Sequence, residues 1–153
     1  MKGEFKMEVQ TQLQMDLSEI LPSGRAYLNE LECKPFPFPY VAYDDERISE
    51  WEHEKEIYGF DSTETWDLNY TFYAWLYEHL RMYQDRAGKI VNLHYHKFEW
   101  KGEEYYQDEI IDMILERLRF RFSEEYDDFE AEQNLYINEI GELWAIVLPA
   151  MWW

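Results

Sequence analysis

The stretch TWDLNYTFYAWLYEHLRMYQD, residues 65–85, contains the strongest helical pattern in the chain. Its apolar side chains recur three and four residues apart, which is the spacing of one face of an α-helix. The expected face consists of Trp66, Tyr70, Tyr73, Leu76 and Leu80, and it is widened by Phe72, Trp75 and Tyr83. An apolar arc this broad predicts a helix that packs against other elements on more than one side.

The flanking residues predict the ends of this helix. Asp61-Ser62-Thr63-Glu64 has the spacing of an N-terminal capping box, and Gly88 is a natural stop. A helix over residues 44–58 is expected to end at Gly59. Apolar residues at helical spacing predict two more helices over residues 108–122 and 135–151.

Residues 90–106 favour strands. The segment from Ile90 to Trp100 is rich in β-formers, and Lys101-Gly102-Glu103 is a turn signal. A short return strand is expected over residues 104–106. The fold class that we expect is therefore α+β, a helix-dominated single domain with a small antiparallel sheet.

The first 43 residues have a different pattern. Apolar and polar residues alternate from Val9 to Leu17, which predicts a strand whose polar face is mostly uncharged glutamine. Such an edge could pair with a second copy of the chain in a homodimer. Proline at every second position from Lys34 to Tyr40 predicts a stiff, extended segment. We therefore expect an N-terminal strand arm and proline-rich linker over residues 1–43, and a helical main body over residues 44–153.

The composition excludes several classes of protein. With 33 acidic and 14 basic residues, the formal net charge is −19. Direct binding of nucleic acid needs a basic footprint, and an anionic membrane surface would repel the chain. The 7 Trp, 13 Tyr and 9 Phe residues supply the apolar surface for a buried core, which a disordered chain lacks. We expect a folded, acidic protein that binds neither nucleic acid nor membranes.

Three features predict the cellular setting. Cys33 is the single cysteine, which is typical of a reducing compartment. The N-terminus lacks the apolar core of a signal peptide. The most apolar stretch, Leu143 to Trp153, is too short to span a bilayer. We expect a cytoplasmic location.

The negative charge is concentrated in two blocks. Residues 44–67 contain 10 acidic and 2 basic residues, and residues 123–153 contain 8 acidic and no basic residues, so each block carries −8. Like charges three or four residues apart destabilise a helix, so a chain that keeps them is expected to use their field. The candidate partner-binding residues are Asp44, Asp45, Glu46, Glu50, Glu52, Glu54, Glu56, Glu124, Glu125, Asp127, Asp128, Glu130 and Glu132. The alternative is that this acidity only keeps an aromatic-rich protein soluble.

The sequence contains no motif that predicts catalysis. It has neither a G-x-S-x-G nucleophile motif nor a phosphate-binding glycine loop. His94 and His96 are two residues apart on the expected strand, but no further ligand at a suitable spacing completes a metal site. We expect a non-enzymatic protein without metal or cofactor.

Three segments carry a resemblance to known proteins. They are Gly59-Phe60-Asp61-Ser62-Thr63-Glu64-Thr65-Trp66-Asp67-Leu68, then His96-Lys97-Phe98-Glu99-Trp100-Lys101-Gly102, and finally Leu143-Trp144 with Leu148 and Trp152-Trp153. Together they resemble a group of small acidic proteins encoded by bacteriophages and prophages. The likeness covers residues 58–153 and brings no catalytic residues. It implies a setting in which such proteins block host defence enzymes, CRISPR nucleases among them.

Two main hypotheses follow, beside a weaker third in which His94 and His96 belong to a metal-dependent enzyme. In the first, the acidic residues imitate the phosphate backbone, and the chain inhibits a nucleic-acid-processing defence enzyme of a bacterial host. In the second, the chain is a structural or assembly module of a phage whose acidity serves solubility. An oligomer that persists in high salt would favour the second hypothesis, and salt-dependent binding to a basic host protein would favour the first.

Overall fold

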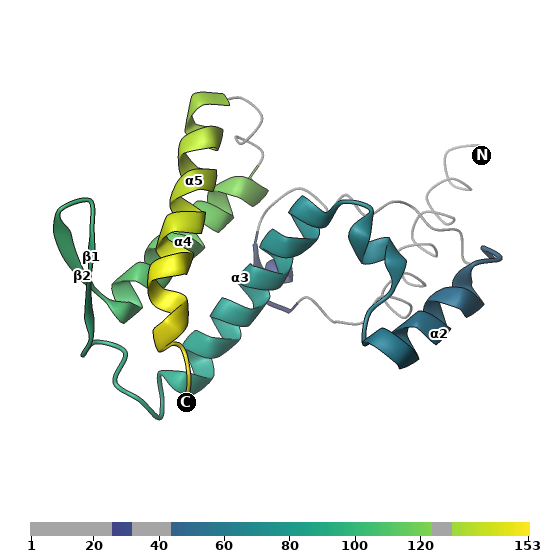
Figure 1. Ribbon diagram of the computed structural model, residues 1–153, viewed down its shortest axis with the longest axis horizontal. Coiled ribbons are helices and arrows are strands. Elements are labelled where there is room, and N and C mark those ends of the chain that lie inside the picture. Colours follow the sequence, from purple (N-terminus) through teal and green to yellow (C-terminus); the bar gives the residue numbers. More distant parts are fainter. Residues whose placement is uncertain (1–25, 32–43, 124–129) are drawn as a thin grey trace. The chain divides into compact units, whose positions relative to one another are not determined.

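The computed structural model describes residues 26–31, 44–123 and 130–153 (Figure 1). The expected strand Val9–Leu17, the proline-rich segment Lys34–Tyr40 and Cys33 lie outside the described residues. The expected division at residue 43 therefore stays a prediction.

Helices dominate the fold, and a two-stranded antiparallel sheet completes it, so the expected α+β class is confirmed. The elements are η1 (Leu28–Glu30), α2 (Ile48–Tyr58), η2 (Ser62–Thr65), α3 (Leu68–Ala87), β1 (Lys97–Trp100), β2 (Glu103–Tyr106), α4 (Gln107–Phe122), α5 (Glu130–Val147) and η4 (Leu148–Ala150). None of the helices in the described residues combines the length and the hydropathy that a membrane span requires.

The described chain divides into two compact units, and the boundary falls inside α3, between Phe72 and Tyr73. The first unit contains the described residues 44–72. The second unit contains the described residues 26–31, 73–123 and 130–153.

The first unit is built around Trp51, which is 3% exposed. The ring of Trp66 meets Trp51 edge-on, with 5.6 Å between the ring centroids. The guanidinium of Arg47 lies 4.9 Å from the centroid of Trp51 and 5.4 Å from that of Trp66. The core of this small unit is therefore formed by a pair of tryptophans in contact with a guanidinium, and not by aliphatic side chains. Helix α2 ends at Gly59 as predicted, in a left-handed conformation with φ of 81°.

The predicted capping residue Asp61 does cap a helix, but it begins η2 and not the long helix. Its carboxylate accepts a hydrogen bond from the backbone N–H of Thr63 at 2.9 Å. The long helix begins later, at Leu68, where the Asp67 carboxylate accepts from the N–H of Tyr70 at 3.1 Å. A second acidic cap after Asp61 explains why the predicted start at residue 65 is three residues early.

The core of the second unit lies where α3, α4 and α5 meet (Figure 1). Tyr77 on α3 and Phe122 on α4 pack edge-on, with ring centroids 6.2 Å apart. The apolar residues of this unit that are at most 1% exposed are Leu76, Leu80, Ala87, Ile110, Ile111, Ile114, Leu115, Leu118, Ile140, Leu143 and Val147. Helix α4 therefore buries an apolar stripe along its whole length, as the spacing over residues 108–122 predicts.

Most of the tryptophans are not buried, although Trp66 and Trp75 belong to the apolar face predicted for residues 65–85. Trp51 is buried, Trp100 and Trp144 are half-buried, and the other four are exposed. The exposed ones are Trp66 at 43%, Trp75 at 48%, Trp152 at 78% and Trp153 at 59%. On α3, the buried arc is narrower than the apolar arc of the sequence, so Phe72 and Trp75 lie outside it.

The hairpin is shorter than predicted. Strands β1 and β2 pair with Lys97 opposite Tyr106 and Trp100 opposite Glu103. Residues 90–96 form turns and not a strand. This segment is tied to α4 instead, because the N–H of Asp108 donates to the carbonyl oxygen of Leu93 at 3.1 Å.

The predicted turn is present at Lys101 and Gly102, which have φ of 50° and 80°. Positive φ at both central residues is the geometry of a type I′ hairpin turn. We expect Gly102→Ala to lower the free energy of unfolding by about 1–2 kcal/mol, because alanine is strained in this conformation. Gly141→Ala is the matched control: Gly141 lies inside α5, and a Cβ there meets nothing within 4 Å. Urea unfolding should show this control to be about 0.5–1 kcal/mol more stable than the wild type, and equal effects of both changes would contradict the turn assignment.

Candidate partner-binding surface

The acidic residues of the first unit have two different roles. Asp44, Glu46, Glu50, Glu52 and Glu56 are exposed, and we call these five residues the acidic surface. Asp45 and Glu54 are partly buried and bind other residues of the same unit. The candidates of the second block are not placed: Glu124, Glu125, Asp127 and Asp128 lie outside the described residues, as do the side chains of Glu130 and Glu132.

Asp45 forms a bidentate pair with Arg47. The guanidinium donates to its two carboxylate oxygens at 3.0 Å and 2.9 Å, and the backbone N–H of Arg47 donates at 2.9 Å. The side-chain hydrogen bonds to Arg47, followed by the backbone hydrogen bond, lower the pKa of Asp45 to about 2. Because Arg47 also covers Trp51, this pair attaches the chain before α2 to the core of the unit.

The Asp45 pair predicts an acid transition in the first unit. A folded-state pKa below the ordinary value means that ionised Asp45 stabilises the fold above pH ~4, and that this contribution is lost as the pH falls through about 2. An NMR titration of the Asp45 carboxyl carbon should give a midpoint near 2 in the wild type. In Arg47→Gln the midpoint should rise toward that of an ordinary aspartate. An ordinary midpoint in the wild type would contradict the pairing.

The other cation of residues 44–67 is also used internally. Lys55 Nζ lies 3.1 Å from Oδ2 of Asp61, whose side chain is completely buried. A buried carboxylate needs such a partner, because desolvation penalises an isolated charge. With Arg47 on Asp45 and Lys55 on Asp61, both basic residues of this segment neutralise carboxylates that belong to the framework of the unit.

Glu54 also has a structural partner. Its carboxylate accepts the backbone N–H of Ser62 at 2.6 Å and the Ser62 hydroxyl at 2.8 Å. These bonds join α2 to η2 and satisfy an N–H at the start of η2. Glu54 is therefore a framework residue as well as a charged one.

The three residues of the acidic surface that lie on α2 span a broad arc of this helix. Glu52 and Glu56 are one turn apart on one side of the helix, and Glu50 is ~160° away from Glu52 around the helix axis. His53 lies between them, with its Nδ1 atom 3.9 Å from a carboxylate oxygen of Glu56. The field of Glu50 also raises the pKa of Arg47, after the larger effect of Asp45. Within the described part of the chain, no lysine or arginine forms an ion pair with the five residues of the acidic surface.

Exposed apolar side chains lie next to these carboxylates in sequence. Ile57 is 58% exposed, Tyr58 is 66% exposed and Phe60 is 48% exposed. Tyr58 and Phe60 pack on each other, with ring centroids 6.3 Å apart. We call Ile57, Tyr58 and Phe60 the apolar end of α2. The sequence pattern did not identify it, although Ile57 falls on the side of the helix away from Trp51 and so had a detectable signal.

The histidines of the second unit do not form the pair that a metal would need. His94 stacks on Tyr106, with ring centroids 3.7 Å apart, and its Nδ1 lies 3.0 Å from Asp108. His96 packs edge-on against Tyr95 instead. Among the described residues, no group of three or more histidine, cysteine or acidic side chains is arranged to hold a metal ion.

Comparisons of the chain with protein-family models, with curated proteins and with solved structures gave no match. The function is therefore inferred from the geometry of the chain. The features that bear on binding are the acidic surface and the apolar end of α2.

Proposed function

We propose that the protein is a non-enzymatic binding protein that attaches to a basic protein through the acidic surface of its first unit. The observation that carries this proposal is the use of Arg47 and Lys55 inside the unit. Since both basic residues of this segment pair with framework carboxylates, neither forms an ion pair with the five exposed carboxylates, and no other lysine or arginine of the described residues does so. The negative field of such carboxylates steers association with a positively charged cleft.

The proposed partner is a nucleic-acid-processing enzyme of a bacterial host. Carboxylates one helical turn apart, such as Glu52 and Glu56, are ~5–6 Å from each other, a separation suited to cationic sites that bind successive phosphates. The resemblance to small acidic phage proteins supports the same partner and implies inhibition of a defence enzyme. The chain would then occupy the groove in which the enzyme binds its nucleic acid.

The apolar end of α2 supports binding to a protein. Carboxylates alone give long-range attraction but modest affinity, because exposed ion pairs contribute little. Tyr58 and Phe60 add aromatic side chains of the kind that dominate the affinity of protein interfaces. We therefore infer that the acidic surface sets the orientation of the partner and that these rings supply much of the contact.

Competition with nucleic acid tests this proposal. The immobilised protein is used to capture partners from a bacterial lysate, and a captured nuclease is purified. We expect the protein and duplex DNA to exclude one another, so that increasing DNA displaces the protein from the nuclease. Formation of a ternary complex with DNA, or capture of no basic protein, would refute the proposal.

A further inference from the structure

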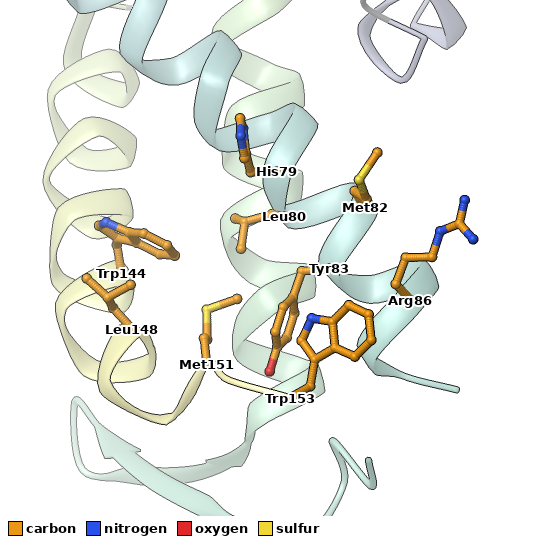
Figure 2. A pocket seen from close by; sticks show the side chains of 9 residues that line it. All are labelled: His79, Leu80, Met82, Tyr83, Arg86, Trp144, Leu148, Met151 and Trp153. Carbon is orange, nitrogen blue, oxygen red and sulfur yellow. The ribbon is translucent and has the colours of Figure 1, made fainter. Parts of the chain in front are cut away.

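A pocket of about 320 Å³ lies in the second unit (Figure 2). Residues of α3 form one wall, and the end of α5 with the segment after it forms the other. Its apolar lining consists of Leu80, Met82, Trp144, Leu148, Met151 and Trp153. This volume lies at the lower end of the range for sites that hold small molecules. The pocket belongs to neither the acidic surface nor the apolar end of α2.

The rim of this pocket exposes apolar side chains to solvent. Met82 is 52% exposed, Leu148 is 47% exposed and Trp153 is 59% exposed. In Figure 2, Tyr83 and Trp153 approach each other on one side of the pocket, while Trp144 and Leu148 lie on the other. Exposed apolar groups that surround a hollow are typical of a ligand-binding site, because an apolar ligand removes them from water.

Two hydrogen-bond donors are available at the pocket. The Tyr83 oxygen accepts a bond from Nε2 of Gln107 at 3.2 Å, so its own O–H can donate to a ligand. Arg86 is exposed at the rim, and within the described residues its side chain forms neither a hydrogen bond nor an ion pair. In Figure 2 the guanidinium points away from the pocket, and its flexible stem allows another rotamer that brings it to the opening.

A third polar residue, His79, forms part of the wall. Its Nδ1 lies 2.7 Å from the carbonyl oxygen of Trp75, and a carbonyl can only accept, so Nδ1 carries the proton. The ring stacks on Trp75, with centroids 4.1 Å apart. These two contacts hold the imidazole as a flat side of the pocket.

No acidic residue is among the nine that line the pocket, all of which are described. The acidic residues nearest in sequence on α3 have other partners: Glu78 accepts from the N–H of Leu28 at 2.8 Å, and Asp85 accepts from the Tyr27 hydroxyl at 2.9 Å. In a chain of net charge −19, a pocket with an exposed arginine and no acidic side chain in its lining is suited to an anion.

We propose that this pocket binds a soluble medium-chain aliphatic carboxylate, with decanoate as the probe. The alkyl chain packs against Leu80, Trp144 and Met151, and the carboxylate accepts hydrogen bonds from Arg86 and Tyr83. A planar guanidinium is well suited to a carboxylate because it can donate two parallel bonds.

Isothermal titration calorimetry with decanoate, decanol and decyltrimethylammonium tests the ligand class. We expect one saturable site for decanoate, binding of decanol weaker by about tenfold, and no binding of the cation. Octanoate should bind more weakly than decanoate, by about fourfold for each methylene removed. Equal affinity for decanoate and decanol would overturn the assignment of a carboxylate, and the absence of saturable binding would overturn the site.

Two pairs of variants locate the site. Arg86→Gln should weaken decanoate binding about tenfold, whereas Lys89→Gln, which removes the same charge outside the lining, should not. Leu148→Asp should weaken it at least tenfold, whereas Leu135→Asp changes a leucine of similar exposure, 51%, away from the pocket and should not. Equal effects within either pair would refute this location.

Co-sedimentation of the wild type with phosphatidylcholine vesicles would instead assign the pocket to a membrane acyl chain and overturn the proposal of a soluble ligand.

Discussion

Replacing Glu139 with alanine is expected to lower the free energy of unfolding of the second unit by about 3 kcal/mol. The Glu139 side chain on α5 is 8% exposed and binds Arg117 of α4 and Lys101 of the hairpin turn. Burial raises the pKa of Glu139, but the hydrogen bonds from Arg117 and Lys101 outweigh it, so the net pKa is lowered. Removing the carboxylate leaves the Arg117 guanidinium, whose side chain is 13% exposed, without an opposite charge, although it still donates to the carbonyl oxygen of Met113 at 2.9 Å.

The size of this effect follows from the position of Glu139, because it connects three elements. Lys101 Nζ lies 3.1 Å from its carboxylate, so the turn of the hairpin is attached to α5 through this residue. Glu142 is the matched control. It also binds the hairpin, accepting the indole N–H of Trp100 at 2.9 Å, but it is exposed. We expect Glu142→Ala to cost less than ~1.5 kcal/mol, since an exposed hydrogen bond is readily replaced by water.

Urea unfolding followed by near-UV circular dichroism measures both changes. The lowered pKa of Glu139 adds a dependence on pH: its contribution is present above the ordinary pKa of a glutamate and is lost as the pH falls through the lower, folded-state pKa. The difference between wild type and Glu139→Ala should therefore shrink in acid. A difference that is independent of pH, or a loss no larger than that of Glu142→Ala, would contradict the role of Glu139.

Reversing the charge of Glu50, Glu52 and Glu56 to lysine is expected to weaken binding of the proposed basic partner by about 100-fold, because like charges then face each other across the interface. Glu54 and Asp45 are left unchanged in this triple variant, since both have structural partners. We expect the helix to remain folded. The change should cost about 1 kcal/mol of stability, because Glu50→Lys places a positive charge near the N-terminal end of the helix dipole. Circular dichroism checks the fold before affinity is measured.

A second triple variant controls for net charge. Glu99, Glu104 and Glu116 are exposed residues of the second unit, and reversing them to lysine changes the total charge by the same amount. We expect this variant to bind the partner with less than about tenfold loss, because the proposed contact is made by the acidic surface and salt screens charges that do not contact the partner. Equal losses in the two triple variants would show that general acidity, and not the acidic surface, attracts the partner.

The sequence predicts those elements whose pattern follows from local rules. Helix α4, Gln107–Phe122, differs from the predicted range by one residue, because Ile110, Ile114 and Leu118 recur at helical spacing. The ends of α2 and α3 agree with the stops predicted at Gly59 and Gly88, and of these two glycines Gly59 has the left-handed φ of a helix cap. Local rules predicted a strand before Trp100 that is too long. Residues 90–96 form backbone hydrogen bonds with the start of α4 instead, and no local pattern in the sequence reveals these bonds.

The candidate site was also predicted only in part, because tertiary contacts that the sequence does not show decide which carboxylates are available for binding. In the sequence, the carboxylates of residues 44–56 are equivalent, and spacing alone assigns all of them to a binding surface. Tertiary contacts separate them: Glu54 binds Ser62, and Lys55 is committed to Asp61. The pair of Asp45 and Arg47 is the exception, because an Asp-x-Arg segment just before a helix is a local signal. The exposure of Trp75 could not be predicted from the sequence either, because an aromatic stripe does not show which of its residues pack against a neighbouring helix.

The central claim is that the acidic surface binds a basic partner, and the salt dependence of that binding is its most direct test. Affinity for the captured partner should be measured between about 0.1 M and about 1 M NaCl, a range over which the Debye length falls from ~10 Å to ~3 Å. We expect the wild type to lose at least about tenfold in affinity, and the triple lysine variant of Glu50, Glu52 and Glu56 to show almost no salt dependence. An affinity for the partner that is the same at both salt concentrations in the wild type would contradict the claim.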